Sequence, residues 1–88
     1  MLTPIALAHL IMGDGTALKY GLIICTDSYS SQDVVRLINV LIIRYRLECS
    51  CYQALTRPRI YIRAQSMPYL REIVKPYITK SMLYKIGL

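Results

Sequence analysis

An aspartate follows directly on an apolar segment near the start of the chain. His9 is the only polar side chain in Leu7–Met12, and Gly13, Asp14 and Gly15 come next. A carboxylate at a helix C-terminus meets the negative end of the helix dipole, which costs about 0.3–1 kcal/mol unless a cation is near. Asp14 is therefore a candidate metal ligand, and Gly15 tolerates a positive φ angle or the close approach of a backbone or phosphate. An ordinary Asp-Gly turn that ends a helix is the structural alternative.

A second candidate site lies where apolar and polar side chains alternate, in residues 59–63. Successive side chains of a strand point to opposite faces, so Arg59, Tyr61 and Arg63 share one face and two isoleucines share the other. Arginine can donate two hydrogen bonds to a guanine edge or a phosphate, and antiparallel ribbons fit a major groove. We expect this face to bind nucleic acid, and a solvated outer sheet face is the alternative.

Other residues are expected to extend this surface. Ser50 and Tyr52 alternate with cysteines in the preceding strand, so they are predicted to join the same face. Lys19, Tyr20 and Arg57 fall at predicted hairpin turns, where we expect them to contact a nucleic-acid backbone.

Composition favours a polyanionic partner. The 88 residues are predicted to form one domain, residues 1–88, and their net charge is +6, with eleven basic and five acidic residues. The hydrophobic share of 55% is high for so short a chain, which indicates that some apolar surface meets another protein or a second copy. No segment approaches the roughly 20 apolar residues of a membrane-spanning helix, so nucleic acid is favoured over a membrane.

Helices and strands are predicted to alternate in the order α-β-β-α-β-β-α. Thr3 and Pro4 are typical of a helix start, and Ser30 or Ser31 is predicted to cap a long helix. The core face of that helix is predicted to consist of Val34, Leu37, Ile38, Leu41, Ile42 and Tyr45. The predicted hairpin arms are 16–20 with 22–26, and 47–55 with 59–64.

The last predicted helix begins after Ser66, runs from Met67 to about Tyr77, and is followed by an irregular tail. Runs of helix and hairpin in this order predict an α+β fold with an antiparallel sheet.

The nine residues from Leu7 to Gly15 resemble the LAGLIDADG motif of homing endonucleases. Residues 21–29, 59–62 and 75–86 are similar to the C-terminal half of two-motif enzymes that are encoded in fungal mitochondrial introns. The resemblance implies an αββαββα domain with one motif copy, a saddle-shaped antiparallel sheet and a mitochondrial location. The chain departs from the motif at His9, Met12 and Gly13, where many relatives have other residues.

The resemblance also implies a division of roles among residues. In such enzymes each motif helix packs against a second motif helix, which implies an interface of Leu7, Ala8, Leu10 and Ile11. The second helix would come from a homodimer partner or a separate half. Asp14 is implied to bind Mg²⁺ with help from the backbone at Gly15. Lys85 matches a lysine that is thought to orient the attacking water or to offset charge in the transition state, and a solvated basic tail is the alternative.

Two functions remain open at this point. The first is a Mg²⁺-dependent, sequence-specific DNA endonuclease domain that binds DNA through its sheet and works when paired with a second motif helix. The second is a non-cleaving RNA-binding module that derives from such an enzyme, either an intron maturase or a structural component of a mitochondrial ribonucleoprotein such as the ribosome. The chain has half the length of a two-motif enzyme, which favours the second function, whereas Asp14 and Lys85 favour the first.

Overall fold

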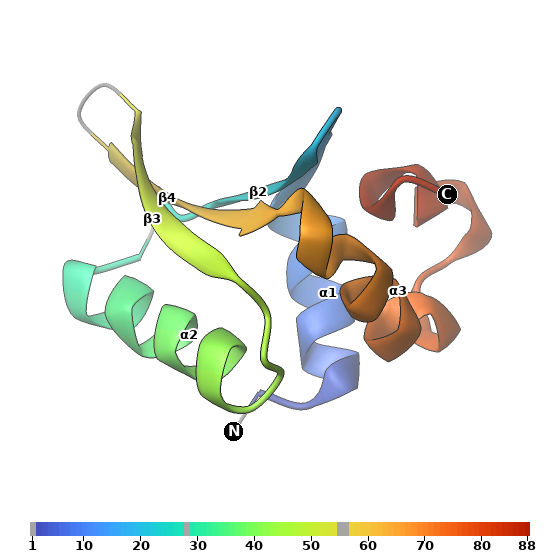
Figure 1. The fold of residues 1–88 in the computed structure, drawn as a ribbon, viewed down its shortest axis with the longest axis horizontal. Coiled ribbons are helices and arrows are strands. Elements are labelled where there is room, and N and C mark those ends of the chain that lie inside the picture. The colour runs from blue at the N-terminus through green and yellow to red at the C-terminus, as the bar shows by residue number, and fades with distance from the viewer. Residues whose placement is uncertain (1, 28, 55–56) are drawn as a thin grey trace.

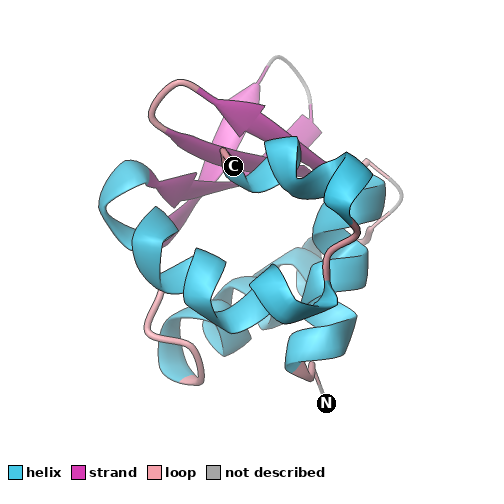
Figure 2. Cartoon of the chain, turned by 90° about the vertical axis from the view of Figure 1, so that its right-hand side faces the viewer, coloured by secondary structure: helices cyan, strands magenta, loops and turns pink. Residues whose placement is uncertain are grey.

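A four-stranded sheet and a layer of helices beneath it make up the computed structural model (Figure 2). The structure describes residues 2–27, 29–54 and 57–88, and for 52–54 and 57–58 it describes the backbone alone. The helices and strands in chain order are α1 (Pro4–Asp14), β1 (Gly15–Leu18), β2 (Gly21–Cys25), α2 (Ser31–Ile43), β3 (Cys49–Ala54), β4 (Arg57–Arg63) and α3 (Met67–Val74). The 3₁₀ segment Ala64–Ser66 comes directly before α3, and two more, Lys75–Tyr77 and Lys80–Ile86, follow it.

The sheet is antiparallel throughout, with the strand order β1-β2-β4-β3. Both hairpins are local, and β2 pairs with β4 to join them, so the centre of the sheet comes from segments far apart in sequence. The hairpin ends rise on the two sides of the sheet in Figure 1, which leaves a concave upper face. The α+β class with an antiparallel sheet is confirmed.

The core lies between the sheet and the helices. Leu22 and Ile24 of β2 and Ile60 and Ile62 of β4 are fully buried on the lower face of the sheet. The helices complete this core with the buried side chains Leu7, Ala8, Ile11, Val34, Leu41, Met67, Leu70 and Val74. Because α1, α2 and α3 all lie below the sheet, the upper face is left as a surface (Figure 1).

Capping residues start two of the helices as the sequence predicts. The Ala6 amide donates to Thr3 Oγ1 at 3.1 Å, and the Asp33 amide donates to Ser30 Oγ at 3.1 Å. Each bond satisfies one of the amides that a helix start leaves without a partner. Ser66 differs, because its Oγ accepts from the Glu48 amide at 2.8 Å and so joins the start of α3 to the strand region. None of the described helices has the length and apolar character needed to span a bilayer.

The structure corrects three local expectations. Ile42, which the helical pattern places in the core, is 43% exposed on α2. The helix expected to run to Tyr77 ends at Val74 and continues as a 3₁₀ turn that contains Pro76, because proline has no amide for the next helical bond. The tail is not irregular, since Lys80–Ile86 is a 3₁₀ segment in contact with α1 and β1, and Ile86 is fully buried.

Candidate nucleic-acid interface and carboxylate site

The strand register places the predicted nucleic-acid-binding residues of β3 and β4 together. Tyr61 pairs with Ser50 on one side and with Ile23 on the other, while Arg59 pairs with Cys25. The alternating Ile60 and Ile62 are fully buried below the sheet, so Arg59, Tyr61 and Arg63 lie on the upper face. The prediction that these residues share one face is therefore confirmed. Tyr52 and Arg57 belong to strands by their backbone, and their side chains lie outside the described part of the structure.

Tyr61 also holds the β1–β2 turn in place. Its hydroxyl donates to the Tyr20 carbonyl oxygen at 2.8 Å, across 41 positions of sequence. Gly21 follows with a φ of +141°, and a Cβ at this position would collide with the Ile62 carbonyl oxygen and crowd the Tyr61 ring. A glycine is required here because the backbone of β4 and the tyrosine ring occupy the space of a side chain.

The turn itself presents Lys19 and Tyr20 to solvent. Tyr20 is 65% exposed, and Lys19 Nζ lies 5.4 Å from the centre of the Tyr20 ring, within the range of a cation–π contact. The pair lies in the turn between β1 and β2, and β1 is an edge strand of the sheet. The position suits the predicted contacts with a nucleic-acid backbone.

Arg59 is half-buried on the upper face, next to β2. Its Nε atom is buried and has no hydrogen-bond partner among the residues that the structure describes. Buried donors of this kind are rare in folded proteins and call for an explanation. An incoming acceptor, such as a base edge or a phosphate oxygen, would give the guanidinium a partner at this atom.

Asp14 is the last residue of α1 and is exposed. Lys85 Nζ donates to the Met12 carbonyl oxygen at 2.6 Å, in the same last turn of the helix. A cation at this end of a helix offsets the negative pole of the dipole. The structure thus brings the two residues expected to be catalytic to the same helix end, although 71 positions separate them in the sequence.

Gly15 allows two backbone segments to approach closely, and its φ angle is negative. Its φ of −82° and ψ of 146° are those of a strand, so of the two properties expected of this glycine the structure uses the close approach of a backbone. A Cβ built on Gly15 would lie 2.6 Å from the Ile11 carbonyl oxygen. The glycine therefore lets β1 leave α1 in tight contact with the last helical turn.

Tyr29 is a neighbour of this site that the sequence did not indicate. Burial first, and then the nearby carboxylates of Asp14 and Asp33, raise the pKa of the Tyr29 hydroxyl above its ordinary value. The tyrosine follows β2 and brings a neutral hydroxyl into the surroundings of Asp14. No local pattern in the sequence points to it, because the proximity arises from the return of the chain after β2.

The exposed side of α1 differs from the expected one. Leu7, Ala8 and Ile11 are 0% exposed within the chain itself, so the prediction that they contact a partner helix is wrong. They pack on the chain's own core, and Leu10 is half-buried. The surface that α1 leaves open contains Ile5, His9 and Gly13. The spacing of four residues puts them on one side of the helix, but the apolar segment carries no signal that this side is the open one.

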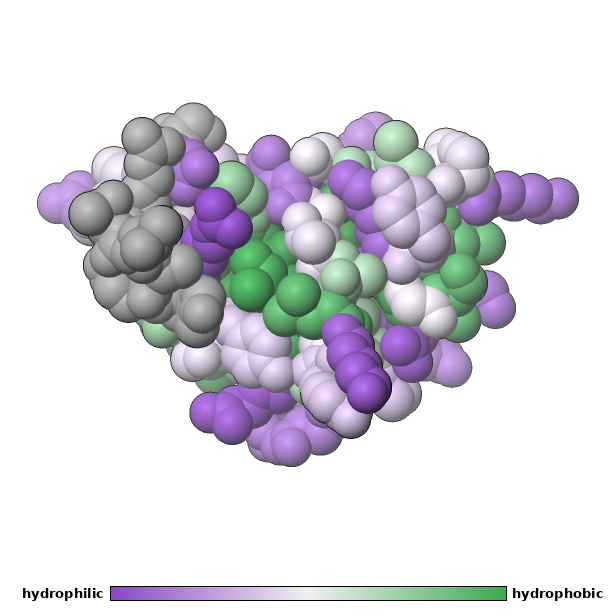
Figure 3. All heavy atoms as spheres, turned by 90° about the horizontal axis from the view of Figure 1, so that it is seen from above, coloured by the Kyte–Doolittle hydropathy of each residue, from purple (hydrophilic) through white to green (hydrophobic). Residues whose placement is uncertain are grey.

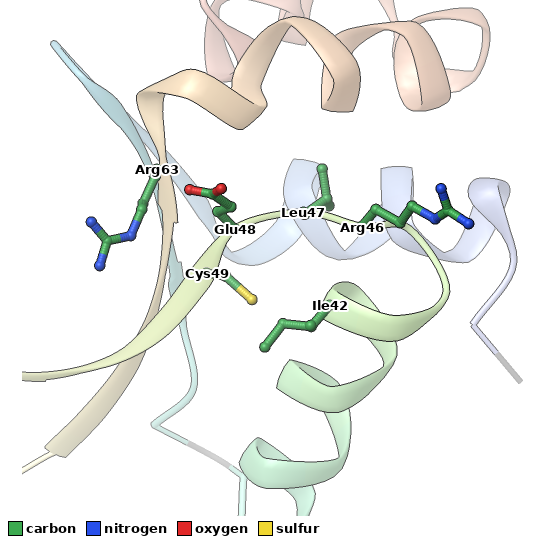
Figure 4. A pocket seen from close by; sticks show the side chains of 6 residues that line it. All are labelled: Ile42, Arg46, Leu47, Glu48, Cys49 and Arg63. Atoms are coloured by element: carbon green, nitrogen blue, oxygen red, sulfur yellow. The ribbon is translucent and has the colours of Figure 1, made fainter.

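A hollow of about 410 Å³ lies where α2, β3 and β4 meet, and Asp14 is not among the residues that line it (Figure 4). The guanidinium groups of Arg46 and Arg63 point in opposite directions at its two ends, so the hollow does not concentrate charge. Cys49 lines it, and burial raises the pKa of this thiol to about 11. A thiol that stays protonated at neutral pH is a poor nucleophile, so the hollow lacks the features of a cysteine-based active site.

Comparison with known proteins gives a single family. Residues 1–70 match the profile of the LAGLIDADG DNA endonuclease family. A cytochrome b mRNA maturase bI2 of Saccharomyces cerevisiae is 42% identical over 98% of this chain and 21% of its own length. The maturase bI2 of Debaryomyces hansenii is 35% identical over 98% of this chain and 34% of its own length. An intron-encoded endonuclease ai4 of Dictyostelium discoideum is 36% identical over 94% of this chain and 54% of its own length.

A solved structure agrees with these relatives. The homing endonuclease I-WcaI, bound to its DNA recognition sequence, superposes with a TM-score of 0.87 and is 32% identical. The match covers 96% of this chain and 40% of the solved one, so the chain spans about a fifth to a half of the relatives it matches. With the family profile, the relatives and the fold in agreement, the chain belongs to the LAGLIDADG DNA endonuclease family.

Proposed function

We propose that the chain is one half of a LAGLIDADG-type endonuclease, which binds double-stranded DNA on its concave sheet face and cleaves it when paired with a second motif helix. The observation that carries the proposal is the arrangement of Arg59, Tyr61 and Arg63 on the exposed upper face, above fully buried isoleucines. Arginines and tyrosines on a ribbon of this kind can contact base edges in a major groove. The DNA-bound relative I-WcaI supports DNA as the ligand.

Pairing is proposed to use the open side of α1. Ile5 is 51% exposed on this helix, and His9 and Gly13 follow at intervals of four residues. Gly13 has no neighbour within 4 Å of the position where a Cβ would stand, so another backbone can approach there. The partner would be a second copy of the chain or a further half that carries its own motif helix.

Asp14 and the backbone beside it fit one half of a Mg²⁺ site. Mg²⁺ is commonly held by one or two carboxylates, with water and substrate phosphates as its other ligands. The described residues contain no cluster of three acidic, histidine or cysteine side chains, and a second carboxylate is proposed to come from the partner half. A bound Mg²⁺ would activate water and neutralise charge at the phosphate. We propose that Asp14 and the Gly15 carbonyl hold the ion, and that Lys85 adds positive charge at the same helix end.

A second candidate function is RNA binding without cleavage. Two relatives are cytochrome b mRNA maturases, and they cover nearly the whole of this chain. The same basic face could then bind an intron RNA or a ribosomal RNA as part of a ribonucleoprotein. We propose a mitochondrial location for either function, because two relatives are named for cytochrome b mRNA and the chain resembles intron-encoded enzymes.

Cleavage by a carboxylate variant tests the proposal. A pool of random DNA duplexes is incubated with the native assembly and Mg²⁺, and new ends are found by sequencing. Asp14→Asn is expected to abolish cleavage while DNA affinity stays within about 1 kcal/mol, because the amide keeps the shape and loses the charge that holds metal. Asp33→Asn, the same change at the start of α2, should cleave like the unmodified chain. Cleavage by Asp14→Asn at the unmodified rate would contradict the nuclease assignment.

A further inference from the structure

The upper face of the sheet is not uniformly polar. Figure 3 looks down on this face and shows apolar atoms at its centre, with polar side chains around them. By the strand register, the apolar residues of β1 and β2 on this face are Leu18, which is 42% exposed, and Ile23 and Cys25, which are half-buried. We call these three residues the apolar strip.

The apolar strip is not part of the core. Leu22 and Ile24, which alternate with its members on β2, are 0% exposed and point to the helices. Ile23 pairs with Thr16, whose side chain is exposed, and the turn at Gly21 leaves Leu18 without a side chain opposite it. The strip therefore presents alkyl and thiol groups on the proposed DNA-binding surface.

Neighbouring residues define what the strip can contact. Ile23 pairs with Tyr61, and Cys25 pairs with Arg59, so each member of the strip on β2 adjoins a residue expected to bind nucleic acid. A phosphate needs hydrogen-bond donors or positive charge, and neither Ile23 nor Leu18 supplies them. The chemistry that matches an alkyl group in a major groove is the C5-methyl group of thymine, the apolar feature among donors and acceptors on the base edges.

We propose that the apolar strip contacts thymine C5-methyl groups, and that Ile23 is a specificity-determining residue for thymine in the DNA half-site. The inference rests on the proposed function and narrows its substrate class. Uracil has the same hydrogen-bonding edge and lacks the methyl group, so the strip would favour DNA that contains thymine over an otherwise equal uracil-containing ligand. The deep and narrow major groove of an RNA duplex would also deny the sheet this contact.

Parallel selections from random pools test the proposal, because they require no chosen target sequence. Two pools of random DNA duplexes are made, one with thymidine and one with deoxyuridine in its place, and both are selected with the same native assembly. The thymidine pool is expected to show positions enriched in thymine. Replacing one such thymine by uracil should weaken binding about four-fold, which is the value of one buried methyl-sized group.

Variants assign the effect to a residue. Ile23→Ala should bring the ratio of thymine to uracil affinities close to one, while Ile43→Ala, the same change at an exposed position of helix α2, should leave it unchanged. Thermal melting checks that both variants fold. If a variant does not fold, the selections from the two pools with the unmodified chain still test the proposal. Equal enrichment of thymine and uracil at the same positions would overturn the proposal. So would a folded Ile23→Ala variant whose ratio of thymine to uracil affinities equals that of the unmodified chain. If the assembly bound neither pool, the DNA-binding function itself would be wrong.

Discussion

Lys85 binds the last turn of α1, where its Nζ donates to the Met12 carbonyl oxygen at 2.6 Å. The bond joins residues 73 positions apart and attaches the C-terminal 3₁₀ segment to the helix that ends in Asp14. Lys85 thus has a structural role that does not depend on catalysis. Because Asp14 follows two residues after Met12, the same bond keeps a positive charge beside the proposed metal ligand.

Removal of this charge should lower stability. Lys85→Met keeps most of the aliphatic chain and loses the donor, so the free energy of unfolding should fall by about 1 kcal/mol, below the value for a fully buried charged hydrogen bond. Lys80→Met, a matched change at an exposed position of the same segment, should change it by less than about 0.5 kcal/mol. Urea unfolding measures both, and equal losses would show that the bond to Met12 contributes nothing specific.

Two glycines that flank Asp14 should respond to alanine in opposite ways. Gly13 lies in α1 and has open space where a Cβ would stand, so Gly13→Ala should stabilise the isolated chain by about 0.5–1 kcal/mol. Gly15→Ala would place its Cβ 2.6 Å from the Ile11 carbonyl oxygen, and we expect a loss of more than about 1 kcal/mol. Thermal melting of the two variants decides the matter, and a stable Gly15→Ala chain would mean that the junction of α1 and β1 is looser than described.

Pairing through the open side of α1 predicts the effect of a new charge. Ile5→Asp should weaken self-association or pairing more than about tenfold, because an unpaired carboxylate would be buried between two helices. Val35→Asp on α2 is the control, since Val35 is similarly exposed, at 56% against 51% for Ile5. Light scattering, with the ratio of absorbances as a check for bound nucleic acid, gives the particle mass. An unchanged mass for Ile5→Asp would place the partner on another surface.

Cysteine reactivity reports on the start of β3. Cys51 is exposed, whereas Cys49 is half-buried and its pKa is raised to about 11 by burial. In the folded chain at pH 8, iodoacetamide should label Cys51 more than about tenfold faster, because the thiolate is the reacting form. Labelling of Cys49 should accelerate as the pH rises towards its pKa, since the thiolate fraction then grows. Peptide mass spectrometry follows each site, and equal rates at pH 8 would contradict the burial of Cys49.

Local patterns explain what the sequence predicts correctly. The caps at Thr3 and Ser30 depend on side chains that bond within their own first turn. The shared upper face of Arg59 and Tyr61 follows from the two-residue period of a strand. Because the intervening Ile60 is buried, the two neighbouring side chains must point to the opposite face.

The remaining features depend on contacts that no local pattern encodes. The segment from Leu7 to Met12 is apolar on almost every side, so its sequence does not show which face meets the core and which stays open. The open side follows only when α3 and the C-terminal segment are seen to pack against α1. The same holds for the effect of the Asp14 charge on the pKa of Tyr29, and for the tail that Ile86 and Lys85 hold in place.

The sheet face is the centre of the account, and DNA affinity of charge variants tests it most directly. Fluorescence anisotropy, on DNA duplexes that the unmodified assembly selects from a random pool, compares Arg59→Ala and Arg63→Ala with Arg36→Ala. All three lose one positive charge, and Arg36 is exposed on α2, below the sheet. The account predicts that the two sheet variants lose about 1–3 kcal/mol of binding free energy, while Arg36→Ala stays within about 0.5 kcal/mol. Equal affinities for all three variants, or a larger loss for Arg36→Ala, would contradict the assignment of the concave face as the nucleic-acid surface.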